Sequence, residues 1–293
     1  MLRAVAGVLR MYESFFGLRE PAFSLAPDPR FLWLSETHEE GLAALVYGIS
    51  RRKGFMLLTG EVGTGKTTLL RAALDQIPSD TEVALVMNTA ELTPTDLLRL
   101  IAAEFSLPGP FHAKVDYIIA LNRFLLTQLE RGMNTVLIID EAQNLDATLL
   151  EEVRLLSNLE TDTEKLLQIV LTGQPELRQK LAASNLRQLR QRVAIEHHVL
   201  PLRQEDAAPY LRHRLQVAGG RFEDVFEPGV ESVFHEFSQG CPRLMSLLAD
   251  RAMLAAFSKQ LRPVPTLLAE RKAKEMAATR LSEPPATEVP KLG

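Results

Sequence analysis

The sequence has little cysteine, no long apolar run and no large excess of charge of either sign. Cys241 is the only cysteine among 293 residues, which excludes an internal disulfide framework and suits a reducing compartment. No apolar run approaches the roughly 18 residues that a membrane-spanning helix needs. The first ten residues are too short and too interrupted for a secretory signal peptide, and Met11 is an alternative to Met1 as the start. The net charge of −4 gives no general attraction to nucleic acid or membranes. A cytoplasmic protein is expected.

Strand and helix patterns alternate along the first two thirds of the chain. Apolar runs predict strands at 54–59, 82–88, 135–140, 166–172 and 193–200. Helical patterns separate them, at 37–52, 67–74, 95–105, 114–131 and 146–159. This alternation predicts an α/β fold, with a parallel five-stranded sheet that carries helices on both faces.

After residue 201 the strand patterns stop and only helical patterns follow. They fall near 204–218, 227–238, 242–259 and 264–280. We therefore predict four parts: an irregular N-terminal segment packing on the core (1–35), the α/β domain (36–201), a small all-helical domain (202–280) and a disordered tail (281–293). The tail assignment follows from its prolines and its low apolar content.

One glycine-rich loop matches the pattern G-x-x-x-x-G-K-[ST] at every fixed position. The matching residues are Gly60, Glu61, Val62, Gly63, Thr64, Gly65, Lys66 and Thr67, with Thr68 next in the following helix. Because the loop lies between a predicted strand and a predicted helix, its backbone N–H groups should surround a polyphosphate. Lys66 would reach the β- and γ-phosphates, and the Thr67 hydroxyl would bind Mg²⁺. The motif, known as Walker A, predicts binding of a nucleoside triphosphate.

Two carboxylates follow the apolar strand at 136–139, in the manner of a Walker B motif. Asp140 would hold Mg²⁺ together with Thr67, and Glu141 would polarise the water that attacks the γ-phosphate. Any buried strand that ends in acidic residues looks similar. The glycine loop and the acidic pair together indicate a triphosphate hydrolase.

The fourth predicted strand ends in polar residues that should lie between the two motif strands. Gln174 is the favoured contact to the attacking water or the γ-phosphate, with Thr172 as the alternative. An ordinary turn residue before the Pro175 helix start explains Gln174 about equally well.

Five basic residues and no acid occupy the stretch from 178 to 192. They are Arg178, Lys180, Arg187, Arg190 and Arg192. They could form a solvated helix face, a nucleic-acid patch, or a source of an arginine donated to the nucleotide of a neighbouring subunit. Arg192 is the candidate for that arginine because it directly precedes the fifth strand, and Arg190 is the alternative.

Gly240-Cys241-Pro242-Arg243 opens a helix of the C-terminal domain. Pro242 fits the first helical position. Arg243 could then fold back over the γ-phosphate from the first turn, or it could be a surface arginine at an ordinary helix start.

In this order, the motifs resemble those of the AAA+ ATPases. The stretches 11–18, 28–31, 140–145, 171–177 and 240–244 resemble more narrowly the ATPase of the general secretion pathway protein A family, the ExeA type. The resemblance covers roughly residues 11 to 275. It implies a P-loop NTPase fold with a small all-helical lid domain, ATP and Mg²⁺ as cofactors, and a homo-oligomer.

The resemblance also implies a role in assembling cell-envelope export machinery for secretion, pili or exopolysaccharide. Such a protein would be cytoplasmic, or peripheral to the inner membrane through an envelope partner. Related AAA+ regulators of transposition share the core, so a DNA-bound ATP switch is the alternative function. A third interpretation, an ATP-dependent scaffold with negligible turnover, leaves Glu141 without a role.

Overall fold

The computed structural model describes residues 11–282, apart from 27, 88 and 163. The chain divides into two compact units. Glu36–Leu200 form an α/β unit, and the described parts of Met1–Ser35 and Pro201–Gly293 form a helical unit. The last helix continues to Ser282, and the rest of the predicted tail lies outside the described residues. Met1 lies outside the described residues with the rest of 1–10, and Met11 is the first described residue.

The α/β unit is built on a five-stranded parallel sheet. Its strands are β1 (Phe55–Gly60), β2 (Thr81–Val86), β3 (Asn134–Ile139), β4 (Gln168–Gly173) and β5 (Val193–Val199). Their order in the sheet is β2-β3-β4-β1-β5, and every neighbouring pair is parallel. The predicted fold class is therefore confirmed. β4 lies between β1 and β3, so the ends of these three strands meet at one edge of the sheet.

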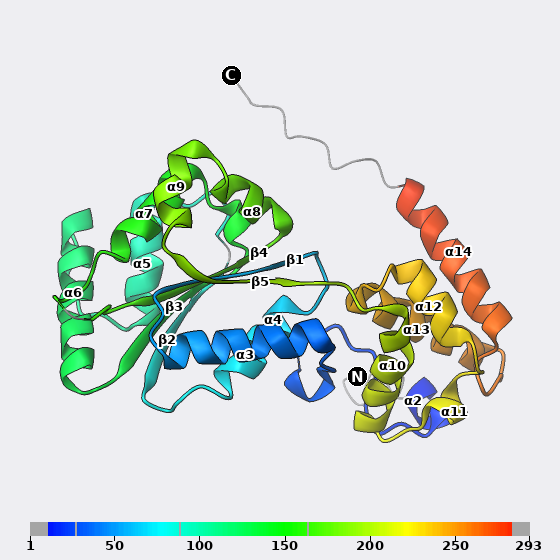
Figure 1. Ribbon diagram of the computed structural model, residues 1–293. Coiled ribbons are helices and arrows are strands. Elements are labelled where there is room, and N and C mark those ends of the chain that lie inside the picture. The colour runs from blue at the N-terminus through cyan, green and yellow to red at the C-terminus, as the bar shows by residue number, and fades with distance from the viewer. Residues whose placement is uncertain (1–10, 27, 88, 163, 283–293) are drawn as a thin grey trace. The chain divides into compact units, whose positions relative to one another are not determined.

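Helices cover both faces of the sheet (Figure 1). One face carries α3 (Glu36–Ser50) and α4 (Lys66–Leu74). The other carries α5 (Pro94–Glu104), α6 (Lys114–Glu130), α7 (Ala147–Leu156), α8 (Pro175–Leu181) and α9 (Arg187–Arg190). Short 3₁₀ turns occur at η2 (Ala142–Asn144) and η3 (Ser184–Leu186).

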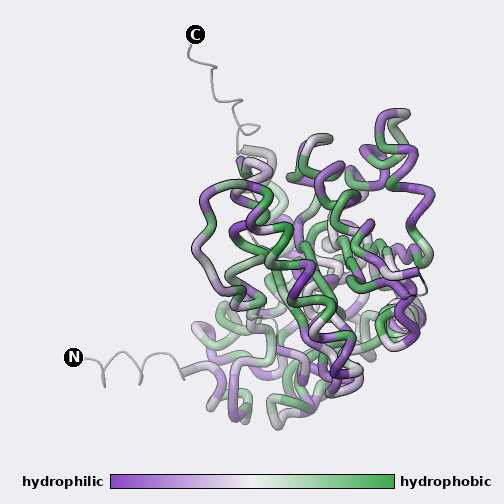
Figure 2. The backbone as a smooth tube through the Cα atoms, turned by 90° about the vertical axis from the view of Figure 1, so that its left-hand side faces the viewer, coloured by the Kyte–Doolittle hydropathy of each residue, from purple (hydrophilic) through white to green (hydrophobic). Residues whose placement is uncertain are grey.

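The central strands are buried along their whole length, which explains their continuous apolar sequences. Every residue of β1, β3 and β4 is buried. Phe55 and Leu57 point into the main core beside α5–α8, whereas Met56 faces Gly48 of α3. Along the helices, apolar and polar residues alternate in the coloured backbone of Figure 2, as expected for helices that pack on one face.

The helical unit contains the helices predicted after residue 201. They are α10 (Gln204–Val217), α11 (Phe222–Val225), α12 (Val230–Ser238), α13 (Pro242–Ser258) and α14 (Thr266–Ser282). The sequence patterns did not predict the four-residue helix α11. Across the described residues of both units, no helix is long and apolar enough to cross a membrane.

The N-terminal segment belongs to the helical unit, which corrects the prediction that it packs on the α/β core. It contains α2 (Met11–Phe16) and η1 (Pro29–Phe31). Phe16, Phe23 and Phe31 are buried in the core of the helical unit. Arg214 of α10 donates from Nε to the Ala22 carbonyl at 2.7 Å. The aromatic residues of this segment predict that it is buried. Without a regular pattern, its sequence does not predict which unit it packs against.

Candidate nucleotide-binding and catalytic site

The glycine loop connects β1 to α4 in a backbone conformation that glycine favours. Gly63 has a φ of 81° and Gly65 a φ of 99°, a left-handed region that strains residues with a Cβ. Gly65 is the N-cap residue of α4, and no side chain caps the helix there. The first N–H groups of a helix lack intrahelical acceptors. This end of α4 can therefore receive an anion.

Lys66 places its ammonium group inside this loop. The residue is only 6% exposed, and Nζ donates to the carbonyls of Gly60 at 2.7 Å and Glu61 at 2.9 Å. Both acceptors are backbone carbonyls of the loop, so they hold the ammonium group at the loop. A phosphate group bound there would add a charge-assisted hydrogen bond.

Thr67 and Asp140 meet although they come from different motifs. The Thr67 hydroxyl donates to Asp140 Oδ2 at 3.2 Å. The other carboxylate oxygen of Asp140 accepts hydrogen bonds from the Thr172 hydroxyl and, at 2.9 Å, from the Glu141 backbone N–H. Asp140 is 3% exposed. A hydroxyl and a carboxylate are the hard oxygen ligands that Mg²⁺ prefers, so these residues fit that ion.

Glu141 lies in a left-handed turn directly after β3. Its φ is 52° and its ψ 38°, a conformation that costs energy for a residue with a side chain and that occurs often at functional sites. Its carboxylate Oε2 accepts from Nε2 of Gln143 and, at 3.4 Å, from Nε2 of Gln174. The Thr89 hydroxyl donates to the Glu141 backbone carbonyl at 2.9 Å.

The two candidates at the end of β4 contact different carboxylates. Thr172 is 1% exposed and binds Asp140, whereas the half-buried Gln174 is the N-cap residue of α8 and contacts Glu141. Thr172 therefore orients the proposed metal ligand. Gln174 is the residue placed beside the proposed catalytic base.

Two further residues of this network carry no motif of their own. Gln143 bridges the Glu141 side chain and the Gln174 backbone, which donates to Gln143 Oε1 at 3.1 Å. A Cβ on Gly173 would lie 2.7 Å from the same oxygen, so the network needs glycine there. The position of Gln143 two residues after Glu141, within the stretch 140–145, was the available signal in the sequence. Nothing in the sequence pointed to Thr89.

His198 lies at the end of β5, beside the last residues of β1. Its Nδ1 lies 2.9 Å from the Thr59 hydroxyl. Burial, together with the positive charge of Arg178, lowers the pKa of the His198 imidazole below its usual value. The ring is therefore neutral at pH 7.

Three of the five basic side chains in the stretch from 178 to 192 have partners within the α/β unit. Arg178 Nε pairs with Glu196 Oε1 of β5 at 2.7 Å. Lys180 Nζ donates to the carbonyls of Gln143 and Leu145. Arg192 donates to the Ser157 hydroxyl and, at 3.5 Å, to the Arg154 carbonyl at the end of α7.

The remaining arginines of that stretch differ from Arg192 in their contacts. Arg187 and Arg190 are exposed, and neither side chain makes a hydrogen bond or ion pair with the part of the chain that the structure describes. Arg192 precedes β5, whose first residue aligns with Phe55 at the start of β1. Within its own unit, Arg192 therefore lies at the sheet edge opposite to the phosphate loop.

Arg243 belongs to the helical unit. It is the second residue of α13, after Pro242 at the first helical position, as predicted, and its side chain is exposed. The helix start is thus as predicted, and the role of Arg243 in nucleotide binding stays a prediction.

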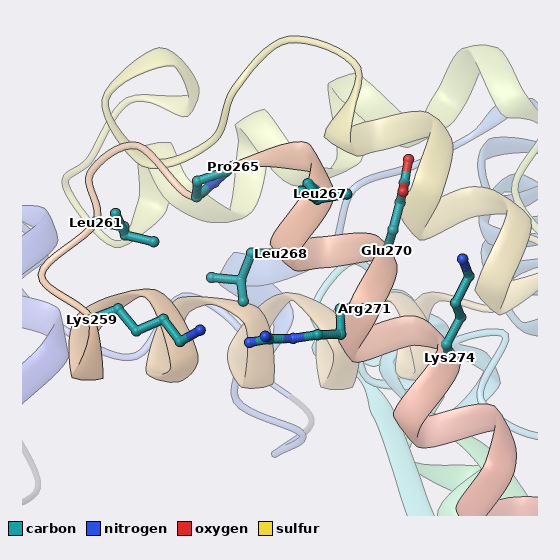
Figure 3. Close-up of a pocket in the computed structure, with 8 residues that line it drawn as sticks. All are labelled: Lys259, Leu261, Pro265, Leu267, Leu268, Glu270, Arg271 and Lys274. Carbon is teal, nitrogen blue, oxygen red and sulfur yellow. The ribbon is translucent and has the colours of Figure 1, made fainter.

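The helical unit also has a cavity of about 480 Å³ along α14 (Figure 3). Leu261, Leu268 and Pro265 form its apolar part, and Lys259 and Arg271 extend toward one another below Leu268. Its lining contains one carboxylate, that of Glu270. The two carboxylates and the lysine of the motifs lie in the α/β unit instead. The candidate site is therefore in that unit and not in this cavity.

The comparison with protein families agrees with this geometry. A family model described as an AAA domain matches residues 49–181, a range that includes the phosphate loop, both carboxylates and the end of β4. The chain contains an AAA domain. The recognition made from the motifs is confirmed, because the chain is also 50% identical over 250 residues to general secretion pathway protein A of Aeromonas hydrophila. The matched region is 85% of this chain but 45% of that relative, so the chain spans less than half of the relative's length.

Solved structures similar to this chain show the same fold at low identity. The ORC2 protein of Aeropyrum pernix has a TM-score of 0.65 at 16% identity, covering 88% of this chain and 73% of its own. Cdc6p of Pyrobaculum aerophilum has a TM-score of 0.66 at 17% identity, with 90% and 74% covered. The RuvB branch migration motor of Thermotoga maritima reaches 0.52 at 18% identity, with 83% and 69% covered.

Proposed function

We propose that this AAA protein binds ATP with Mg²⁺ and hydrolyses it to ADP and phosphate. The observation that carries the proposal is the convergence of Lys66, the Thr67–Asp140 pair and Glu141 at the ends of β1 and β3. Three chemical tasks are thereby assigned within one α/β unit: phosphate binding, metal binding and water activation.

Each residue has a role that follows from its contacts. The loop amides from Gly60 to Thr68 and the ammonium of Lys66 bind the triphosphate. Thr67 and Asp140 would hold Mg²⁺, which supplies positive charge against the phosphate oxygens. The Glu141 carboxylate accepts a proton from the attacking water. Gln174 orients Glu141 through its amide and can reach the same water.

Phosphate release by the purified chain tests this proposal. Wild-type protein should release phosphate from ATP in the presence of Mg²⁺, and chelation of the metal by EDTA should stop the release. Glu141→Gln should lower the rate by about 10²–10⁴, the usual contribution of a positioned general base. Glu176→Gln, an exposed acid on α8, is the matched control and should retain the wild-type rate. No metal-dependent release by wild type would contradict the proposal.

The pathway that the ATPase serves is proposed from similarity alone. The relative of 50% identity is named for the general secretion pathway. We infer that this chain acts on the cytoplasmic side of an inner membrane and supports assembly of an envelope export machine through a protein partner. Co-purification with inner-membrane export components in an ATP-dependent manner would support this inference.

We further propose a homo-oligomer in which an arginine acts on the nucleotide of the neighbouring subunit. Arg192 was the first candidate, and its contacts with Ser157 and Arg154 give it a role within its own unit. Arg190 is exposed and keeps its charge available. Such an arginine contributes about 10³–10⁵ in rate.

A mixing experiment identifies the donated arginine. Lys66→Ala is combined in turn with Arg190→Ala and with Arg192→Ala. On this account Lys66→Ala and the variant that lacks the donated arginine are each inactive alone. Activity returns only in the mixture whose arginine acts across the interface, since mixed assemblies then contain sites with both groups. Co-assembly is checked by light scattering. No recovery in either mixture, despite co-assembly, would exclude both arginines.

The alternative function, a DNA-dependent regulator of the transposition type, is tested by measuring the ATPase rate with and without duplex DNA. Arg178 pairs with Glu196, and Lys180 and Arg192 donate to neutral groups of their own unit, so three of the five side chains that a DNA patch on this stretch would use already have intrachain partners. An ATPase rate that rises several-fold with DNA would favour the alternative.

A further inference from the structure

A buried histidine outside every motif contacts the phosphate loop. His38, in the first turn of α3, is 2% exposed. Its Nε2 lies 2.8 Å from the carbonyl oxygen of Thr64, inside the loop. A Cβ built on Gly65 would lie 3.3 Å from the same nitrogen, so the ring packs closely against the loop backbone. A carbonyl oxygen can only accept, and Nε2 of His38 therefore carries the proton.

This hydrogen bond fixes the orientation of one peptide group of the loop. In a planar trans peptide, the carbonyl of one residue and the N–H of the next point in opposite directions. Holding the Thr64 carbonyl against α3 therefore turns the Gly65 N–H away from α3. The bond thus determines the direction of a donor in the segment that is proposed to surround the phosphates.

A second histidine holds the helix turn from which His38 projects. His197 of β5 has its Nε2 2.7 Å from the Thr37 carbonyl, so this nitrogen also donates. A Cβ on Gly41 would lie 2.7 Å from the His197 ring, and glycine at that position allows the ring to lie between α3 and β5. His197 therefore fixes the first turn of α3. The His38 hydrogen bond then fixes the loop relative to this turn.

The histidine pair also lies where the chain enters and leaves the α/β unit. The unit begins at Glu36 and ends at Leu200. Thr37 and His38 follow Glu36 at the start of the unit, and His197 lies three residues before its end. The two hydrogen bonds therefore connect the phosphate loop with both connections to the helical unit.

We propose that His38 is a positioning residue for triphosphate binding, and that His197 acts through it by fixing the first turn of α3. The inference rests on the proposed function, because the ligand of the loop is the triphosphate. His38 contacts the loop through the Thr64 backbone carbonyl, so its effect is on the geometry of the donors and not on the chemistry of hydrolysis.

The test compares side chains that keep or lose a donor at the same place. His38→Gln retains an amide N–H near the position of Nε2, whereas His38→Leu fills the space without a donor. Binding of fluorescent ATP and ADP analogues is measured, along with amide exchange of residues 60–67 in the nucleotide-free protein. His38→Leu should weaken both nucleotides about tenfold, the effect of one lost hydrogen bond, and should speed exchange in the loop. His38→Gln should stay near wild type in both measurements.

The double variant separates one connected path from two independent effects. Because His197 acts through His38, His197→Leu alone should weaken nucleotide binding. Introduced together with His38→Leu, it should cause little further loss of affinity. His112→Leu, an exposed histidine of the same unit, is the control and should change nothing. Thermal melts establish that each variant folds, and His38→Asn, whose amide is too short to reach the carbonyl, replaces His38→Leu if that variant does not fold.

Three results would overturn the inference. A folded His38→Leu with wild-type affinity and wild-type loop exchange removes the positioning role. A folded His38→Gln as weak as His38→Leu shows that the donor is not what matters, and multiplying effects in the double variant show that His197 acts separately. If wild type binds no nucleotide, the proposed function fails, and the exchange measurement still decides the role of His38.

Discussion

The Thr67 hydroxyl donates to the Asp140 carboxylate at 3.2 Å across 73 positions of sequence. Thr67 stands in the first turn of α4, and Asp140 directly follows β3. Two parallel strands, separated only by β4, bring these positions to one edge of the sheet. The pair joins the phosphate-binding and acidic motifs into one site.

Removal of the Thr67 hydroxyl should affect nucleotide binding only when Mg²⁺ is present. Thr67→Val keeps the shape but loses the oxygen ligand, and we expect about a tenfold loss of Mg·ATP affinity, comparable to one interaction with a charged group. Thr67→Ser keeps the hydroxyl and should behave like wild type. ATP titrations with Mg²⁺ and with EDTA make the comparison. An equal loss under both conditions would mean that Thr67 does not act through the metal.

The two polar residues at the end of β4 should have separable effects. Gln174→Ala removes the amide beside Glu141 and should lower kcat while the Kd for ATP stays near wild type. Thr172→Val removes a donor to the buried Asp140 and should weaken Mg²⁺ binding and lower the melting temperature. Steady-state kinetics and thermal melts distinguish the two variants. The reverse assignment would follow if Thr172→Val lowered kcat alone.

Arg243 should distinguish ATP from ADP if its motif has the role that the family resemblance implies. A guanidinium that bonds the γ-phosphate loses this partner after hydrolysis, so Arg243→Ala should weaken ATP more than ADP. Arg251→Ala, an exposed arginine of the same helix, should change neither affinity. Titration of both nucleotides measures the ratio. Equal losses would leave Arg243 with a structural role at the start of α13.

The half-buried His198 should make folding stability depend on pH below neutrality. Its pKa in the folded state is lowered, so the unfolded chain takes up a proton first as the pH falls. Stability is therefore full above about pH 6.5, the ordinary histidine pKa, and declines as the pH falls toward the folded value. His198→Leu should show a smaller decline between pH 7.5 and 5.5 in thermal melts. An unchanged decline would place its origin in other groups.

The sheet and the motif residues were predictable because their patterns are local. Continuous apolar runs such as 136–139 identify buried parallel strands, and the fixed spacing of Gly60, Gly65 and Lys66 identifies the loop. The end of the fourth strand was expected between the two motif strands, where β4 lies. The full order of the five strands was not predicted.

The features that the sequence did not predict depend on contacts between residues that are distant in the sequence. The partner of Arg178 is Glu196, and nothing near Arg178 in sequence indicates it. His38 reaches the loop from 26 positions away, and the N-terminal aromatic residues pack with helices that begin after residue 201. A single sequence shows that such residues are buried or charged, but their partners are fixed only by the tertiary fold.

The central claim is that one α/β unit binds ATP through Lys66 and hydrolyses it through Glu141. The most direct measurement is the nucleotide retained after incubation with Mg·ATP and rapid removal of free ligand, analysed by chromatography. The account predicts ADP on the wild-type protein, ATP on Glu141→Gln, and almost no nucleotide on Lys66→Ala. ADP on Glu141→Gln at the wild-type level, or full retention by Lys66→Ala, would contradict it.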